Sequence, residues 1–113
     1  MIITGKELKI DELKGMAQRL FGNLIKAVVD VERGLIAVDA ELHSDLESLL
    51  LQDGSKQKDL WGINLYPDLE GAEFVEFDSM INMRPSQGNR SRGVESIELR
   101  NKIISIVQKK ITR

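Results

Sequence analysis

The centre of the fold is predicted from one stretch, Ile25-Lys-Ala-Val-Val-Asp-Val-Glu-Arg-Gly-Leu-Ile-Ala-Val-Asp-Ala40. This stretch combines strand-like alternation with a tight turn. Between residues 25 and 32, apolar side chains alternate with charged ones, as in a strand that is buried on one face. Val28 is the exception, since it falls on the polar face. Arg33-Gly34 suits a turn, and residues 35–40 continue as a second strand. We therefore predict a β-hairpin.

Helices are predicted on either side of this hairpin and at the end of the chain. Residues 11–21 carry an apolar stripe at helical spacing, with Asp11 as a cap and Gly22 placed to end the helix. Ser44-Asp45-Leu46-Glu47 matches a capping box, so a short helix should follow it. The last helix is expected to begin at Ser96 as its cap and to carry its basic residues at the end.

Strands complete the pattern. Met1–Thr4 is a candidate edge strand, and the alternation in Leu60–Tyr66 and Phe74–Met83 predicts a second hairpin. The resulting order is β-α-β-β-α-β-β-α. It predicts a single α+β domain over residues 1–113, in which two antiparallel hairpins form a mostly antiparallel sheet with three helices packed on one face.

Composition excludes several kinds of site. The chain has no cysteine, which rules out disulfides and sulfur-ligated zinc, and it has a single histidine. We therefore predict no metal and no cofactor. The apolar runs are too short to span a membrane, and the N-terminus lacks the pattern of a signal peptide. These features favour a cytoplasmic protein without membrane contact.

Charge is distributed unevenly along the chain. Residues 84–113 hold eight Lys or Arg and two acids, which gives +6, whereas residues 1–83 hold eight Lys or Arg and sixteen acids, which gives -8. This asymmetry indicates either a basic binding surface or an acidic body that pairs with the basic segment inside the same fold. The weakly acidic total of -2 makes nucleic acid an unlikely partner.

The ten residues from Arg84 to Gly93 form a long polar loop with three arginines and no acid. The central Gln-Gly-Asn suits a turn whose backbone N–H groups converge on one anion, and guanidinium groups suit phosphate or carboxylate. The candidate ligand-binding residues of this loop are Arg84, Gln87, Asn89, Arg90 and Arg92. The alternative is that the chain's own carboxylates hold the arginines, with Asp39, Glu76 and Asp78 as the expected partners.

A polar face is predicted on the second hairpin. Asn64 and Tyr66 face the same way on one strand, and Glu76, Asp78 and Asn82 do so on the other. If the strands pair, these side chains form one patch that leads into the arginine loop. Asn64, Asp78 and Asn82 are therefore added to the candidate ligand-binding residues. The alternative is the solvated face that antiparallel sheets normally have.

His43 is the only candidate catalytic side chain. In an extended backbone it shares a face with Glu41 and Asp45, and such a set can move protons as a general base. The predicted cap at Ser44 instead places Asp45 in a helix and breaks the shared face. The alternative for His43 is a local hydrogen bond just before the helix cap.

Several unusual strings run through most of the chain: Lys26-Ala-Val-Val-Asp30-Val-Glu32, Glu41-Leu-His43-Ser-Asp45, Asp53-Gly-Ser55-Lys-Gln57-Lys-Asp-Leu60-Trp61-Gly62-Ile-Asn64-Leu-Tyr66-Pro67 and Ile81-Asn82-Met-Arg84-Pro85-Ser-Gln87-Gly88-Asn89-Arg90-Ser91. In these strings, over roughly residues 11–110, the chain resembles a family of small uncharacterised prokaryotic proteins known only as a domain of unknown function. The resemblance implies no activity, so no catalytic role is carried over. Where this chain has Asp39-Ala40, the resemblance leads us to expect two glycines.

Three functions follow as hypotheses. The first is a domain whose Arg84–Arg92 loop binds an anionic small molecule or the carboxylate of a protein partner. The second is a small enzyme that uses His43 with nearby carboxylates and the arginines as anion clamps. The third is a homodimeric interaction module that uses an exposed edge strand such as Met1–Thr4.

Overall fold

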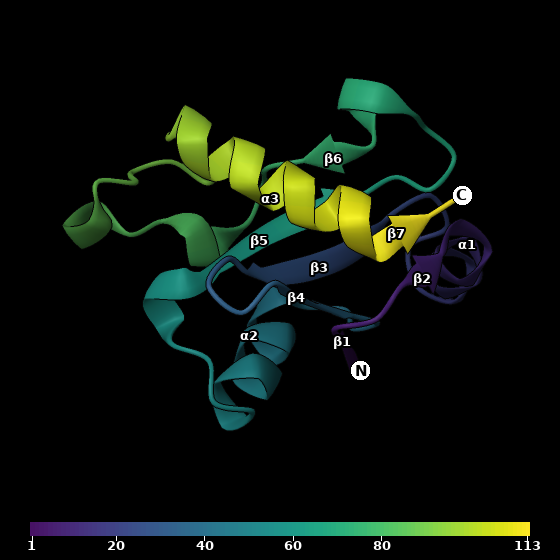
Figure 1. Ribbon diagram of the computed structural model, residues 1–113, viewed down its shortest axis with the longest axis horizontal. Helices are drawn as coiled ribbons and strands as arrows, with labels where there is room; N and C mark the ends of the chain where they lie inside the picture. The colour runs from purple at the N-terminus through teal and green to yellow at the C-terminus, as the bar shows by residue number, and fades with distance from the viewer.

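The predicted hairpin lies at the centre of the computed structural model, which describes residues 1–113 (Figure 1). Strand β3 (Ile25–Asp30) pairs with β4 (Leu35–Val38) in antiparallel register. Gly34 adopts a φ of +67° in the turn between them, a left-handed conformation that costs a glycine little. The prediction of this hairpin is confirmed.

Five antiparallel strands form the main sheet, in the order β1-β4-β3-β5-β6. β1 (Ile2–Thr4) is the predicted edge strand, and β6 (Val75–Glu76) forms the other edge beside β5 (Leu60–Leu65). A second, parallel pair consists of β2 (Leu8–Lys9) and β7 (Ile111–Thr112), and the sequence patterns did not predict it. The α+β class is confirmed.

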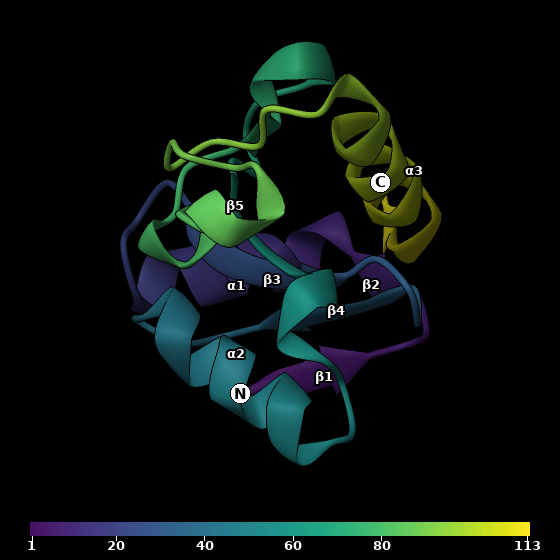
Figure 2. The ribbon, with the colours of Figure 1, turned by 90° about the vertical axis from the view of Figure 1, so that its left-hand side faces the viewer.

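Helices cover both faces of the sheet, so the expectation of one covered face is wrong. α1 (Ile10–Arg19) and α3 (Ile97–Lys110) pack on one face, and α2 (His43–Gln52) packs on the other (Figures 1 and 2). Val28 is fully buried beneath α2, which explains its position among polar neighbours. None of the helices is long and apolar enough to cross a membrane.

Two apolar clusters therefore stabilise the sheet. The larger one lies under α1 and α3 and includes Leu13, Met16, Ile25, Val29, Ile63, Ile103 and Val107. The smaller one lies under α2 and consists of Val28, Ala37, Leu46, Leu50 and Leu60. Side chains of β3 belong to both clusters, because successive side chains in a strand point to opposite faces of the sheet.

The helix starts differ in part from the predicted caps. α3 begins after Ser96, whose hydroxyl accepts a hydrogen bond from the backbone N–H of Leu99 at 3.2 Å, as predicted. The capping box at Ser44 does not form, because α2 already begins at His43 and has no side-chain cap. α1 likewise begins before Asp11. In both cases the first helical residue is buried, and that packing sets where the helix begins.

The strand predicted over residues 74–83 is too long. β6 ends after two residues, and residues 80–82 form a 3-10 turn, η3. The Asn82 amide takes the place of the missing strand: its Oδ1 accepts from the Gly62 N–H at 2.8 Å, and its Nδ2 donates to the Gly62 oxygen at 2.9 Å. Gly62 permits this approach, because a Cβ there would lie 2.6 Å from the Cβ of Ser79.

Asp39 stands where the family resemblance led us to expect glycine, and its backbone explains why. Its φ is +74°, and it is the only residue other than glycine with a positive φ. Aspartate tolerates this left-handed conformation better than most residues, because its short polar side chain can hydrogen-bond locally. The turn after β4 therefore keeps a glycine-like backbone without a glycine.

Candidate functional site

Backbone carbonyls hold the Arg84 guanidinium, with no anion involved. Its Nε, Nη1 and Nη2 atoms donate to the backbone oxygens of Ile81, Gln57 and Leu60, respectively. The guanidinium also stacks on Trp61, 4.5 Å from the ring centroid. Burial lowers the pKa of Arg84 and the Glu47 carboxylate raises it, but a guanidinium stays charged in proteins. Arg84 thus joins η3 to the start of β5, which neither sequence hypothesis anticipated.

The loop does contain converging backbone N–H groups, and a carboxylate of the same chain occupies them. The N–H groups of Arg90 and Ser91 both donate to one Glu95 oxygen, the second at 3.1 Å. These two bonds lower the pKa of the Glu95 carboxyl from its ordinary value. The predicted anion nest therefore exists two to three residues later than expected, and Glu95 fills it.

Asn89 organises the loop from inside. It is buried, and its Nδ2 donates to the backbone oxygens of Asn82 and Gly93, each at 2.8 Å. Its Oδ1 accepts from the backbone N–H of Glu95 at 2.9 Å. Gln87 donates to a backbone oxygen across the loop, that of Lys58, at 3.2 Å. Asn82, Gln87 and Asn89 therefore act on the protein's own backbone.

The remaining loop arginines differ from each other. Arg92 forms an ion pair with Asp78, with 2.7 Å between Nε and Oδ1, as the alternative hypothesis predicted. This pair is exposed on both sides, so its contribution to stability is small. Arg90 is exposed, and its side chain has no partner in the chain. As built, the loop leaves one free guanidinium, which is too little to clamp an anion.

Asn64 lies on the same face of β5 as Leu60 and has one unused acceptor. It is 7% exposed, and its Nδ2 donates to Glu76 Oε1 at 2.8 Å. The Tyr66 hydroxyl donates to the same Glu76 oxygen at 3.0 Å, so the predicted polar face forms in part. The Asn64 Oδ1 atom is buried and has no hydrogen-bond partner. Such an atom is unusual, because buried polar groups are normally paired.

His43 is brought near the loop by α2. Its Nε2 lies 2.7 Å from the Ile63 oxygen, so Nε2 carries the proton and donates, which leaves the Nδ1 lone pair free. Burial lowers the pKa of His43 from 6.5, and the Ile63 carbonyl opposes that shift. The charges of Lys26 and Arg92 also lower the pKa of His43, and the charge of Asp78 raises it. This hydrogen bond joins α2 to β5, twenty residues away in the sequence, so the expectation of a local bond is wrong.

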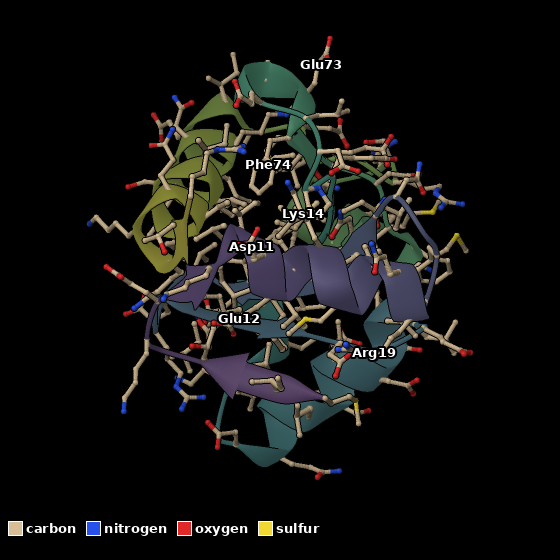
Figure 3. All side chains as sticks on the ribbon, turned by 90° about the vertical axis from the view of Figure 1, so that its right-hand side faces the viewer. Asp11, Glu12, Lys14, Arg19, Glu73 and Phe74 are labelled. Atoms are coloured by element: carbon tan, nitrogen blue, oxygen red, sulfur yellow. The ribbon has the colours of Figure 1, made fainter.

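A large cavity lies elsewhere, between α3 and the segment that carries β6. We call it the α3 groove; its volume is about 910 Å³ and most of its lining is apolar. Figure 3 shows Phe74 turned inward beside α3, whereas the adjacent Glu73 points outward. The apolar walls are formed by Phe74, Val75, Phe77, Ile97, Ile104 and Val107.

Two guanidinium groups flank the α3 groove, one toward each end. Arg100 lies over the Phe77 ring at 5.3 Å, and Arg113 lies over the Phe74 ring at 5.0 Å. Each guanidinium donates a hydrogen bond to a backbone oxygen. Arg100 donates to the oxygen of Val94, and Arg113 donates to the oxygen of Leu69 at 3.0 Å. Neither belongs to any of the four ion pairs of the chain. The groove therefore combines apolar walls with two oriented positive charges that lack carboxylate partners.

One signal in the sequence pointed to this groove. The apolar stripe of the last helix is wider than one packing face needs, and Ile97 and Ile104 widen it. In the structure Ile97 is 74% exposed and Ile104 lines the groove, whereas Ile103 and Val107 of the same helix are buried in the core. The aromatic wall could not be anticipated, because the two phenylalanines reach the groove only through the turn before β6 and the irregular backbone after it.

Comparisons with known proteins complete the description. No curated protein and no solved structure matches the chain. One family model, described as a protein of unknown function, DUF5674, matches residues 1–110. That match covers nearly the whole domain, from β1 to the end of α3. The chain therefore belongs to the DUF5674 family of proteins of unknown function.

Proposed function

We propose that this protein binds an amphipathic anion, meaning an apolar ligand that carries a carboxylate, in the α3 groove. The carrying observation is the pair of guanidinium groups, Arg100 and Arg113, which flank an apolar groove and have no carboxylate partner. We therefore propose the α3 groove as the site of the anionic ligand that was expected at the Arg84–Arg92 loop, where only the Arg90 guanidinium is free of partners within the chain.

The size and chemistry of the groove support this proposal. Its volume of about 910 Å³ lies within the range of small-molecule pockets. Burial of a hydrocarbon or aromatic group against the apolar walls stabilises the complex by about 25 cal/mol per Å² of apolar surface removed from water. Guanidinium groups bind carboxylates with paired N–H donors, and each Arg here is already oriented by its carbonyl and its phenylalanine. Less side-chain freedom is lost on binding as a result.

Titration with dodecanoate, below its micelle concentration, tests the proposal by calorimetry and by amide chemical shifts. We expect saturable binding that shifts the resonances of Val75 and Ile104. Because dodecanoate has one carboxylate and the two guanidinium groups lie toward opposite ends, one of Arg100→Gln and Arg113→Gln should weaken it about tenfold, in line with loss of one charge-assisted hydrogen bond. Arg90→Gln is the matched control, because that arginine is exposed and free but lies in the loop. Equal binding by all three variants, or none by the parent protein, contradicts the proposal.

A second candidate function is an enzyme in which His43 acts as a general base. One observation favours it: burial keeps the imidazole neutral near pH 7, and the hydrogen bond of Nε2 to the Ile63 oxygen leaves Nδ1 free to accept a proton. A screen of ester and phosphoester substrates tests it, with His43→Gln as the control. Turnover that is the same in both proteins, or absent from both, rejects this function.

Two further expectations accompany the proposal. We propose a cytoplasmic protein, and we propose that it forms a homodimer through the open edge of β1, where Ile2 is 41% exposed. Light scattering at rising protein concentration tests the dimer. A mass that stays at 12.7 kDa contradicts it.

A further inference from the structure

We propose that the occupant of the α3 groove is an extended peptide with a free carboxyl terminus, added as a strand beside β6. This inference rests on the function proposed above, and it names the kind of ligand. It comes from the backbone at the groove wall, which that proposal does not use.

The peptide group of Val75 provides this wall with an unpaired donor and an unpaired acceptor. The Tyr66 N–H donates to the Phe74 oxygen at 2.9 Å, which makes these two residues a hydrogen-bonded pair. In an antiparallel ladder such pairs alternate, so Asn64 and Glu76 form the next hydrogen-bonded pair. Val75 lies between them, and its N–H and oxygen therefore point away from β5. β6 is the edge of the sheet, and no other strand pairs with it.

The Val75 side chain also lines the groove, so a ligand there contacts the side chain and the peptide group together. When a second strand adds to an edge strand, its carbonyl oxygen accepts from the free N–H of the edge residue, and its N–H donates to the free oxygen of that residue. A simple hydrocarbon chain leaves both of them without a partner other than water. This difference favours a peptide over other amphipathic anions.

The dimensions of the groove suit a short peptide. The four residues from Phe74 to Phe77 span about 10 Å if extended, in three steps of ~3.3 Å each. The wall formed by α3 has 14 residues and is about 21 Å long, at ~1.5 Å per residue. Between these limits the groove accommodates about three to six residues in extended form. The flanking Arg100 and Arg113 then offer a guanidinium to the terminal carboxylate.

The test uses an acetylated tetrapeptide of valine and isoleucine with a free carboxyl terminus. Two matched peptides serve as controls: the C-terminal amide, and peptides N-methylated at each of the central residues in turn. Binding is measured by calorimetry, and the Val75 amide is followed by NMR and by hydrogen exchange. We expect the amide peptide and at least one N-methylated peptide to bind at least tenfold more weakly than the parent. We also expect exchange of the Val75 amide to slow at least tenfold in the complex.

The outcomes separate the two proposals. If dodecanoate binds but the tetrapeptide does not, the groove takes anions and the peptide inference is overturned. Tetrapeptide binding without slower exchange at Val75, or without any effect of N-methylation, also overturns it. If neither probe binds, both proposals fail. Since every control changes the ligand and leaves the protein unaltered, a folding defect cannot produce these results.

Discussion

Asn82→Ala should remove the side chain that replaces a missing edge strand. Asn82 is fully buried, and its amide makes three hydrogen bonds to the backbone. Two of them pair with the N–H and the oxygen of Gly62, at 2.8 and 2.9 Å. The third runs to the oxygen of Arg92 at 2.9 Å. Together they join β5 to η3 and to the segment that leads into α3.

The magnitude follows from what the alanine leaves behind. A typical hydrogen bond contributes about 1 kcal/mol net, and a buried group left without a partner costs about 1–3 kcal/mol. Three bonds to three backbone groups, two of them on the buried Gly62, therefore predict a loss of about 3–4 kcal/mol in the free energy of unfolding. That is a large part of the roughly 5–15 kcal/mol by which small domains are stable. The melting temperature should fall by about 10 °C or more.

Equilibrium unfolding in urea, followed by circular dichroism, measures this loss. Asn23→Ala is the matched control, because Asn23 is exposed and its side chain has no hydrogen bond; it should change stability by less than about 0.5 kcal/mol. If Asn82→Ala costs under about 1 kcal/mol with an unchanged urea slope, the amide does not replace a strand, and the reasoning is wrong.

Four other perturbations have defined outcomes. Gly62→Ala should destabilise the protein by about 1–3 kcal/mol in the same urea assay, because its Cβ would lie 2.6 Å from Ser79, and a wild-type midpoint would refute the contact. Arg84→Lys should cost about 1–2 kcal/mol, since an ammonium cannot reach three carbonyls at once, whereas a neutral result would mean that charge alone matters. The pKa of Glu95 is lowered in the folded state, so the stability it contributes is present above about pH 4.5 and is lost as the pH falls through the folded pKa; Glu95→Gln should flatten this acid limb. The pKa of His43 is also lowered, so the unfolded chain takes up its proton first and stability falls as the pH drops below 6.5; unfolding at pH 7.5 and 5.5 should show a smaller difference for His43→Gln.

Elements with a local pattern could be predicted from the amino-acid sequence. The hairpin at residues 25–40 follows from alternation and a glycine turn, and the cap of α3 at Ser96 follows from a hydroxyl placed before an apolar stripe. Such features depend on residues within a few positions of one another, so spacing is enough to find them. Val28, the exception to the alternation, lies on a second buried face that was not predicted from the sequence.

The partners of these side chains and backbone groups became clear only in the folded structure. Arg84 was expected to face an anion or a carboxylate, and it binds carbonyls of residues up to 27 positions away. The N–H groups of Arg90 and Ser91 do converge, but they bind the Glu95 carboxylate of the same chain, because the chain folds back within five residues. The α3 groove depends on the position of β6 relative to a helix more than twenty residues later. Periodicity tells which face of an element is apolar but not which element it meets, because partners are chosen by packing across the whole chain.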